Sequence, residues 1–96
     1  MAEYNYDSCN RVRLEFEEQY GTVVRKIEKN NTILRDLQVK YDILKSLSET
    51  YNEYSEELDK IDNEIMIAKK YGSSLENEKV YAQRKVKELD RIQYNK

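Results

Sequence analysis

The spacing that decides the fold lies in residues 23–44, which read VVRKIEKNNTILRDLQVKYDIL. Apolar side chains recur there at alternating intervals of four and three residues, and Asn30 is the only polar residue in the series. This period keeps one stripe on one face of an α-helix and is the heptad pattern of coiled coils, whose stripe occupies the positions named a and d. The stretch predicts a long amphipathic helix that pairs with another helix.

The alternation continues on both sides of this stretch. It reaches back to Phe16 and reappears between Leu47 and Gln93, where Gly72, Lys79 and Gln93 are weak positions. About eleven heptads exceed the three or four that indicate a coiled coil. The predicted oligomer interface consists of Phe16, Tyr20, Val23, Ile27, Asn30, Leu34, Leu37, Tyr41, Leu44, Leu47, Tyr51, Tyr54, Leu58, Ile61, Ile65, Ala68, Leu75, Ala82, Val86 and Leu89.

The two stretches of the stripe are joined by a change of phase. Tyr41, Leu44 and Leu47 follow one another at intervals of three and three. Such a stammer overwinds a helix locally without ending it. The phase change therefore predicts one helix that continues from the first stretch into the second.

Composition points to one all-α domain. Of the 96 residues, 38% are charged and 39% hydrophobic, and there are two glycines and no proline, so turn-forming residues are scarce. We expect a flexible tail at residues 1–7 and a helical segment at residues 8–94. Breaks are expected, if anywhere, at Gly21 and Gly72, because each follows a tyrosine and precedes a hydroxyl residue that suits a helix N-cap.

Two architectures would bury the stripe, which contains more than a dozen apolar groups, each contributing about 1.5–3 kcal/mol when buried. One is a parallel homo-oligomeric rod of continuous helices, on the order of 130 Å long at 1.5 Å per residue. The other is a helical hairpin that turns near Gly72. Charge slightly favours the hairpin, since residues 49–64 carry seven acids and residues 79–96 carry six bases. That hairpin leaves residues 22–47 without a partner of equal length, so the rod is favoured.

Several apolar residues lie outside the stripe. Met66, Ile67, Tyr71, Val80 and Tyr81 form a candidate partner patch, or else part of a broader core. Two polar or reactive side chains also stand out. Asn30 either fixes the alignment of the paired helices or weakens it. Cys9, the single cysteine, has no internal disulfide partner and is expected to be a small packing residue.

The sequence offers little that suggests catalysis. It has no histidine and no glycine-rich phosphate loop, so we expect no enzyme activity, cofactor, metal site or small-molecule substrate. The net charge of −2 argues against nucleic acid as a partner. No apolar run is long enough for membrane insertion and no signal peptide is visible, so an intracellular location, cytoplasmic or nuclear, is expected.

These patterns predict a non-enzymatic structural protein. The favoured function is an oligomerising coiled-coil rod or spacer in an intracellular assembly of the cytoskeletal, spindle or kinetochore, or membrane-tethering type. We expect a homodimer with a further protein partner. The alternative is a helical-hairpin binding module that docks a partner helix through Ile67, Tyr71 and Tyr81.

Overall fold

The protein consists of two long helices joined by a tight turn. The structure, a computed structural model, describes residues 6–94 except for the side chains of residues 6, 90 and 92–94. Helix α1 spans Tyr6–Thr50, a short 3₁₀ helix η1 spans Asn52–Tyr54, and helix α2 spans Ser55–Tyr94. No strand occurs in this part of the chain. The all-α prediction is confirmed, and the predicted tail at residues 1–7 falls mostly outside the described residues.

Helix α1 ends where helix formers give way to weaker ones. The last backbone hydrogen bond of its helical series joins the Tyr51 amide to the Leu47 carbonyl at 2.9 Å. Tyr51 is extended, with φ −128° and ψ 128°, and the next three residues form η1. Thr50, Tyr51 and Asn52 all have lower helix propensity than Lys45, Leu47 and Glu49 shortly before them. The chain therefore leaves α1 at low cost at this point.

Helix α2 begins in a segment rich in acids. Glu53 lies in the turn, and Glu56 and Glu57 lie in the first helical turn of α2. Carboxylates near a helix N-terminus interact favourably with the partial positive charge of the unpaired amides there, by about 0.3–1 kcal/mol each. At the other end of α2, Arg91 complements the negative end of the dipole. The acidic run thus marks where α2 starts.

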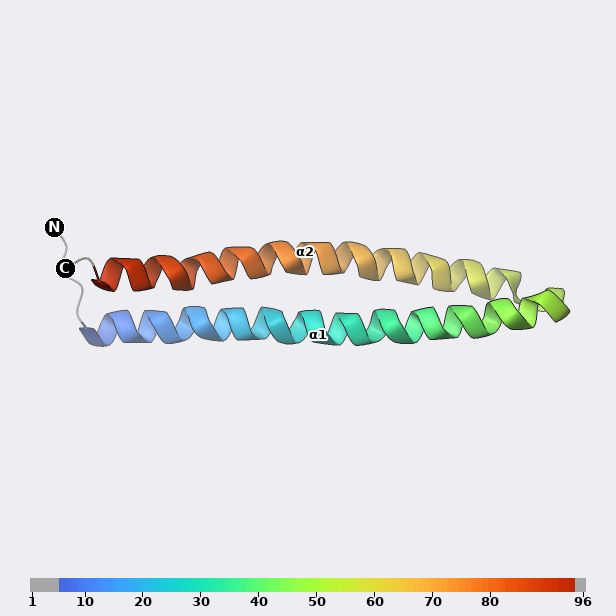
Figure 1. The fold of residues 1–96 in the computed structure, drawn as a ribbon, viewed down its shortest axis with the longest axis horizontal. Coiled ribbons are helices and arrows are strands. Elements are labelled where there is room, and N and C mark those ends of the chain that lie inside the picture. Colours follow the sequence, from blue (N-terminus) through green and yellow to red (C-terminus); the bar gives the residue numbers. More distant parts are fainter. Residues whose placement is uncertain (1–5, 95–96) are drawn as a thin grey trace.

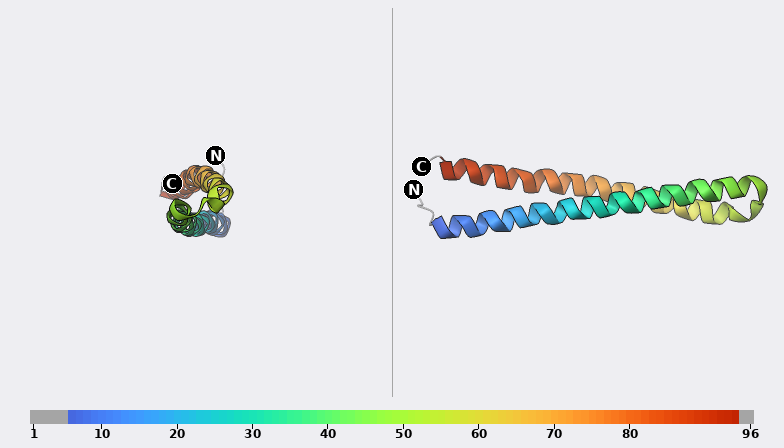
Figure 2. Two further views of the ribbon diagram at one scale, coloured as in Figure 1. Left: turned by 90° about the vertical axis from the view of Figure 1, so that its right-hand side faces the viewer. Right: turned by 60° about the horizontal axis from the view of Figure 1, so that its bottom comes forward.

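The two helices lie antiparallel over their whole length (Figure 1), so that the beginning of α1 and the end of α2 lie at the same end of the molecule. The molecule measures 72 × 16 × 15 Å. A second view shows the helices crossing each other obliquely along the hairpin (Figure 2). The result is a rod that is two helices thick.

Two predictions about the path of the chain are wrong. The chain does not continue as one helix from residue 8 to 94, because it reverses at residues 51–54. It does not turn at Gly72, because α2 runs through that residue, as α1 runs through Gly21. Neither glycine has a positive φ, the conformation that a glycine at a helix end usually supplies. A glycine inside a helix costs only about 1 kcal/mol, and packing offsets that cost here.

The core is a thin stripe between the helices. Its buried apolar residues are Cys9, Ile61, Ile65, Ala68, Leu75 and Ala82. In α1 the alternation of four and three continues past Leu44 to half-buried Ser48, whereas Leu47 is 39% exposed. The predicted stammer is therefore wrong: the phase change marks the turn between two helices, each of which keeps a regular period.

Candidate functional site

The alignment of the two helices is fixed at mid-length by Asn30 and Gly72. The Asn30 side-chain amide is buried and donates a hydrogen bond of 3.0 Å to the Ala68 carbonyl oxygen of α2. A methyl group at Gly72 would lie 3.1 Å from the Asn30 nitrogen, tighter than ordinary van der Waals contact. The missing side chain of Gly72 thus gives the amide room to reach the backbone of α2. Asn30 of the α1 stripe and Gly72 of the α2 stripe are therefore partners.

Near the open end, Lys85 of α2 connects the helices in the same register. Its ammonium group donates a hydrogen bond of 3.3 Å to the Gln19 side-chain oxygen on α1. The same nitrogen lies 5.2 Å from the centre of the Phe16 ring and 4.8 Å from that of the Tyr81 ring. Cation–π contacts at exposed sites contribute about 0.5–1 kcal/mol each. Lys85 thus bridges two aromatic rings on different helices.

This register places most of the predicted interface residues inside a single chain. Leu75 is 1% exposed and Ile61 2% exposed, and both lie between α1 and α2. Leu47 and Tyr51 are exposed beside the turn. The side chain of Gln93 lies outside the described residues. The remaining predicted stripe residues are half-buried or buried: Phe16, Tyr20, Val23, Ile27, Asn30, Leu34, Leu37, Tyr41, Leu44, Tyr54, Leu58, Ile65, Ala68, Gly72, Lys79, Ala82, Val86 and Leu89.

The layers predicted for a hairpin at Gly72 are wrong as well. A turn at Gly72 would have placed Ile61 at the level of Val86 and Ile65 at the level of Ala82. With Asn30 opposite Gly72, helical geometry places Ile61 at the level of Tyr41 instead, and Val86 at the level of Phe16. The acidic start of α2 therefore lies beside the end of α1, far from the basic end of α2.

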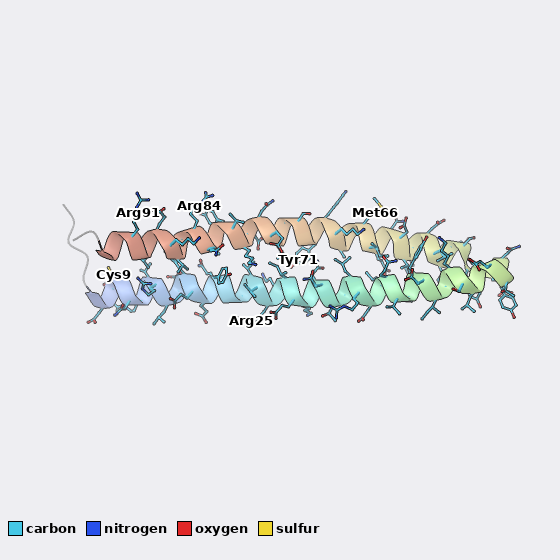
Figure 3. All side chains as sticks on the ribbon, viewed as in Figure 1. Cys9, Arg25, Met66, Tyr71, Arg84 and Arg91 are labelled. Atoms are coloured by element: carbon cyan, nitrogen blue, oxygen red, sulfur yellow. The ribbon has the colours of Figure 1, made fainter. Side chains whose placement is uncertain are left out.

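The candidate partner patch divides between two sides of α2. All five of its residues are exposed, from 48% at Tyr71 to 67% at Ile67. By helical spacing, Ile67, Tyr71 and Tyr81 occupy heptad positions c and g on one flank of the stripe. Met66 and Val80 occupy position b on the other flank. In Figure 3, Met66 lies on the outer side of α2 and Tyr71 on the side bordering α1.

Helix α1 contributes apolar side chains to the same side as Ile67, Tyr71 and Tyr81. In an antiparallel helix pair the g positions of both helices border one face, and the hydrogen bond between Lys85 and Gln19 joins two g positions here. Exposed apolar residues of α1 recur at positions g and c. Together with those of α2 they form what we call the apolar flank: Val12, Ile33, Ile43 and Leu47 of α1, and Ile67, Tyr71 and Tyr81 of α2.

Sequence reasoning missed three of these residues. Val12, Ile33 and Ile43 were not assigned to any patch, and Leu47 was assigned to the stripe. The signal was available, because they too recur at heptad spacing, at positions g and c. These residues can be assigned to a shared flank only when it is known which helix lies beside α1. That depends on where the chain reverses direction.

The opposite flank, formed by positions e and b, is more polar. The residues at its e positions include Asn31, Gln38 and Lys45 on α1, and Asp62 and Lys69 on α2. Its exposed apolar residues are Leu14, Met66 and Val80. Figure 3 shows Arg25, Arg84 and Arg91 pointing away from the partner helix on the outer surface. The apolar surface is therefore concentrated on one flank.

Charge is distributed unevenly along α2. Residues 55–64 carry five acids and one base, whereas residues 79–91 carry five bases and two acids. Among the described residues, no three acidic or cysteine side chains gather into a group that would hold a metal ion. Neither helix has, within its described part, an apolar stretch long enough to cross a membrane.

Comparison with models of known protein families, with curated proteins and with solved structures finds no match for this chain. The arguments about its function therefore rest on the geometry of the hairpin.

Proposed function

We propose that the chain is a non-enzymatic assembly protein. Its two helices form an antiparallel coiled coil, and this hairpin packs through the apolar flank against helices of another protein chain. It thus contributes two preassembled helices to a larger bundle. Of the two functions inferred from the sequence, the hairpin binding module fits the fold, and the continuous rod does not.

The observation that carries this proposal is the alignment of exposed apolar side chains on one flank of both helices. A helix of a larger bundle buries positions a and d together with either e or g. Here Ile33, Leu47 and Tyr71 occupy g positions and remain 39–48% exposed, while the stripe between the helices is covered. Exposed apolar side chains that gather on one face are typical of protein interaction sites.

Site-specific photocrosslinking in cells tests the proposal. A photoreactive p-benzoylphenylalanine is introduced at position 67 on the apolar flank or, as the matched control, at position 77. Asn77 is an exposed residue on the outer face of α2. We expect a covalent adduct with a defined partner protein from position 67 and none of comparable yield from position 77.

A third probe at position 71 shows whether a missing adduct at position 67 results from a poorly placed probe or from a flank that binds no protein. If positions 67 and 71 both give no more adduct than position 77, while circular dichroism shows that helicity is intact, the flank has no protein partner and the proposal is wrong. Equal, unspecific yields from all three positions would also contradict it.

A further inference from the structure

We propose that the apolar flank binds a second copy of this chain, in an antiparallel arrangement with the two-fold axis at the level of Ser74. This inference rests on the proposed function and names its partner. The turn of each hairpin then lies over the open end of the other, and the two hairpins form a four-helix bundle. Three observations support it: the exposed area, the residues along α2 and the residues along α1.

The molecule exposes more surface than a chain of its size usually does. Its accessible area is 7849 Å². A compact monomer of 11.6 kDa exposes about 5,800 Å², so the excess is roughly 2,000 Å². A protein–protein interface of standard size removes about 800 Å² from each partner. One further hairpin packed along the flank accounts for a large part of the excess, whereas a short peptide covers too little.

The residues at the c and g positions of α2 form a line centred on Ser74. When this line is paired with the same line running in the opposite direction, complementary residues lie opposite each other. In the antiparallel dimer each residue lies, to within one position, at the level of the residue equally far beyond Ser74 in the second copy. Lys60 then lies at the level of Glu88, Glu64 at that of Lys85, and Ile67 at that of Tyr81. The complete line reads Lys60, Glu64, Ile67, Tyr71, Ser74, Glu78, Tyr81, Lys85 and Glu88.

This arrangement also pairs opposite charges over longer distances. The acidic first part of α2, residues 55–64, lies over the basic part of the second copy's α2, residues 79–91. Two such contacts occur in the dimer, because a two-fold axis repeats every contact. At the centre, the small side chain of Ser74 allows the two helices to approach closely.

The line of α1 on the same flank complements itself about the same axis. Val12 lies at the level of Ile43 of the second copy, and Glu15 at that of Lys40. At the centre Lys26 lies at the level of Lys29 of the second copy, and this contact, which the axis repeats, repels. Such an exposed pair costs little, because surface charge interactions are on the order of 1 kcal/mol or less.

Two other dimers fit less well. If both turns lay at one end, α2 would lie over α1 of the second copy, and its five acids at residues 56–64 would face residues 38–46, where two lysines and one aspartate leave little positive charge to attract them. If the opposite flank were used, α2 would still complement itself, with Met66 at the level of Val80. On that flank of α1, however, Glu17 lies at the level of Asp42 and Leu14 at that of Lys45.

Disulfide trapping tests both the partner and its orientation. In full-length chain carrying Cys9→Ser, cysteine is placed either at Ser74 on the apolar flank or at the neighbouring Ser73 on the opposite flank. Both serines are exposed. A disulfide forms when the two Cα atoms come within about 7 Å. We expect Ser74→Cys to form the dimer under mild oxidation at least ten times faster than Ser73→Cys. Light scattering of the Cys9→Ser protein should give twice 11.6 kDa.

Each other result points to a different failure. A mass of 11.6 kDa at 100 µM, with an adduct to a different protein from position 67, leaves the proposed function standing and excludes the second copy. A dimer in which Ser73→Cys crosslinks faster places the interface on the opposite flank. If neither cysteine traps the dimer, and spin labels at position 52 show that the two turns lie close together, the orientation proposed here is wrong. All three outcomes overturn this inference.

Discussion

At the scale of single residues, Asn30 and Gly72 are each unfavourable in their own helix. Asn30 brings a polar group into the apolar stripe, and Gly72 lacks a side chain and lowers helix propensity. Together they form one contact, because the amide occupies the space above the glycine and bonds to the Ala68 carbonyl. A shift of one helix by a turn would leave the amide buried without a partner, at a cost of about 1–3 kcal/mol. The pair therefore favours one alignment.

The two glycines should respond in opposite ways to alanine. At Gly21 an added methyl group would meet only Arg25, at an ordinary 3.5 Å. We expect Gly21→Ala to raise the free energy of unfolding by about 0.5–1 kcal/mol through helix propensity. We expect Gly72→Ala to lower it by about 1 kcal/mol, because the methyl group displaces the Asn30 amide. Urea unfolding followed by circular dichroism measures both, and stabilisation by Gly72→Ala would contradict the packing described.

A double-mutant cycle isolates the contact between these residues. In an Asn30→Ala background no amide obstructs the new methyl group, so Gly72→Ala should stabilise the hairpin by about 1 kcal/mol. The coupling energy between the two positions is then on the order of 2 kcal/mol, within the range for residues in direct contact. A coupling energy near zero in urea unfolding would show that Asn30 and Gly72 do not meet.

Leu75 and Leu47 were both predicted to belong to the stripe, but only one of them is buried. Leu75 is almost fully buried, whereas Leu47 is 39% exposed beside the turn. We expect Leu75→Ala to lower the free energy of unfolding by about 2–3 kcal/mol, at the lower end for buried leucines because a two-helix core relaxes easily. Leu47→Ala should lower it by less than about 1 kcal/mol. Thermal unfolding of both variants, at a concentration where each is monomeric, checks the difference.

At the scale of the elements, the sequence predicted the buried stripe and missed the turn. Helical spacing from Phe16 to Leu89 assigned most of the buried residues, because burial in a helix follows its period. The same stripe fits a partner helix from another chain or from the same chain, so it cannot say which one covers it. Proline and glycine are absent from residues 48–55, and the turn instead combines weak helix formers with acids that favour a new helix start.

Because the turn has no strong helix breaker, its replacement should convert the hairpin into an exchanged dimer. We expect Tyr51→Ala with Asn52→Ala to join α1 and α2 into one helix, whose two halves pair with those of a second copy. Small-angle scattering would then show a maximum dimension of roughly 140 Å, at 1.5 Å per residue, in place of the 72 Å of the hairpin.

The control is Asn52→Gly, which keeps a flexible residue in the turn and should retain the short particle. If the double alanine variant also stays near 72 Å, the turn is held by more than helix propensity.

At the scale of the whole molecule, pairing with a second copy should make stability depend on concentration. Anything that binds only the folded state raises the melting temperature as its concentration rises. We expect the melting temperature of the wild type to rise between 2 and 200 µM. Ile67→Lys on the apolar flank should remove this dependence, and Met66→Lys on the opposite flank should preserve it. Differential scanning calorimetry measures all three, and equal behaviour of the two lysine variants would argue against the flank assignment.

The position of the two helix ends has a mechanical consequence. Since α1 begins and α2 ends at the same end of the rod, tension applied there separates the helices one layer at a time, starting from that end. Each layer resists alone, so the rod yields gradually under such a load. The amide of Asn30 bonded to the backbone of α2 lies about halfway along that path, and it is the layer at which we expect opening to pause.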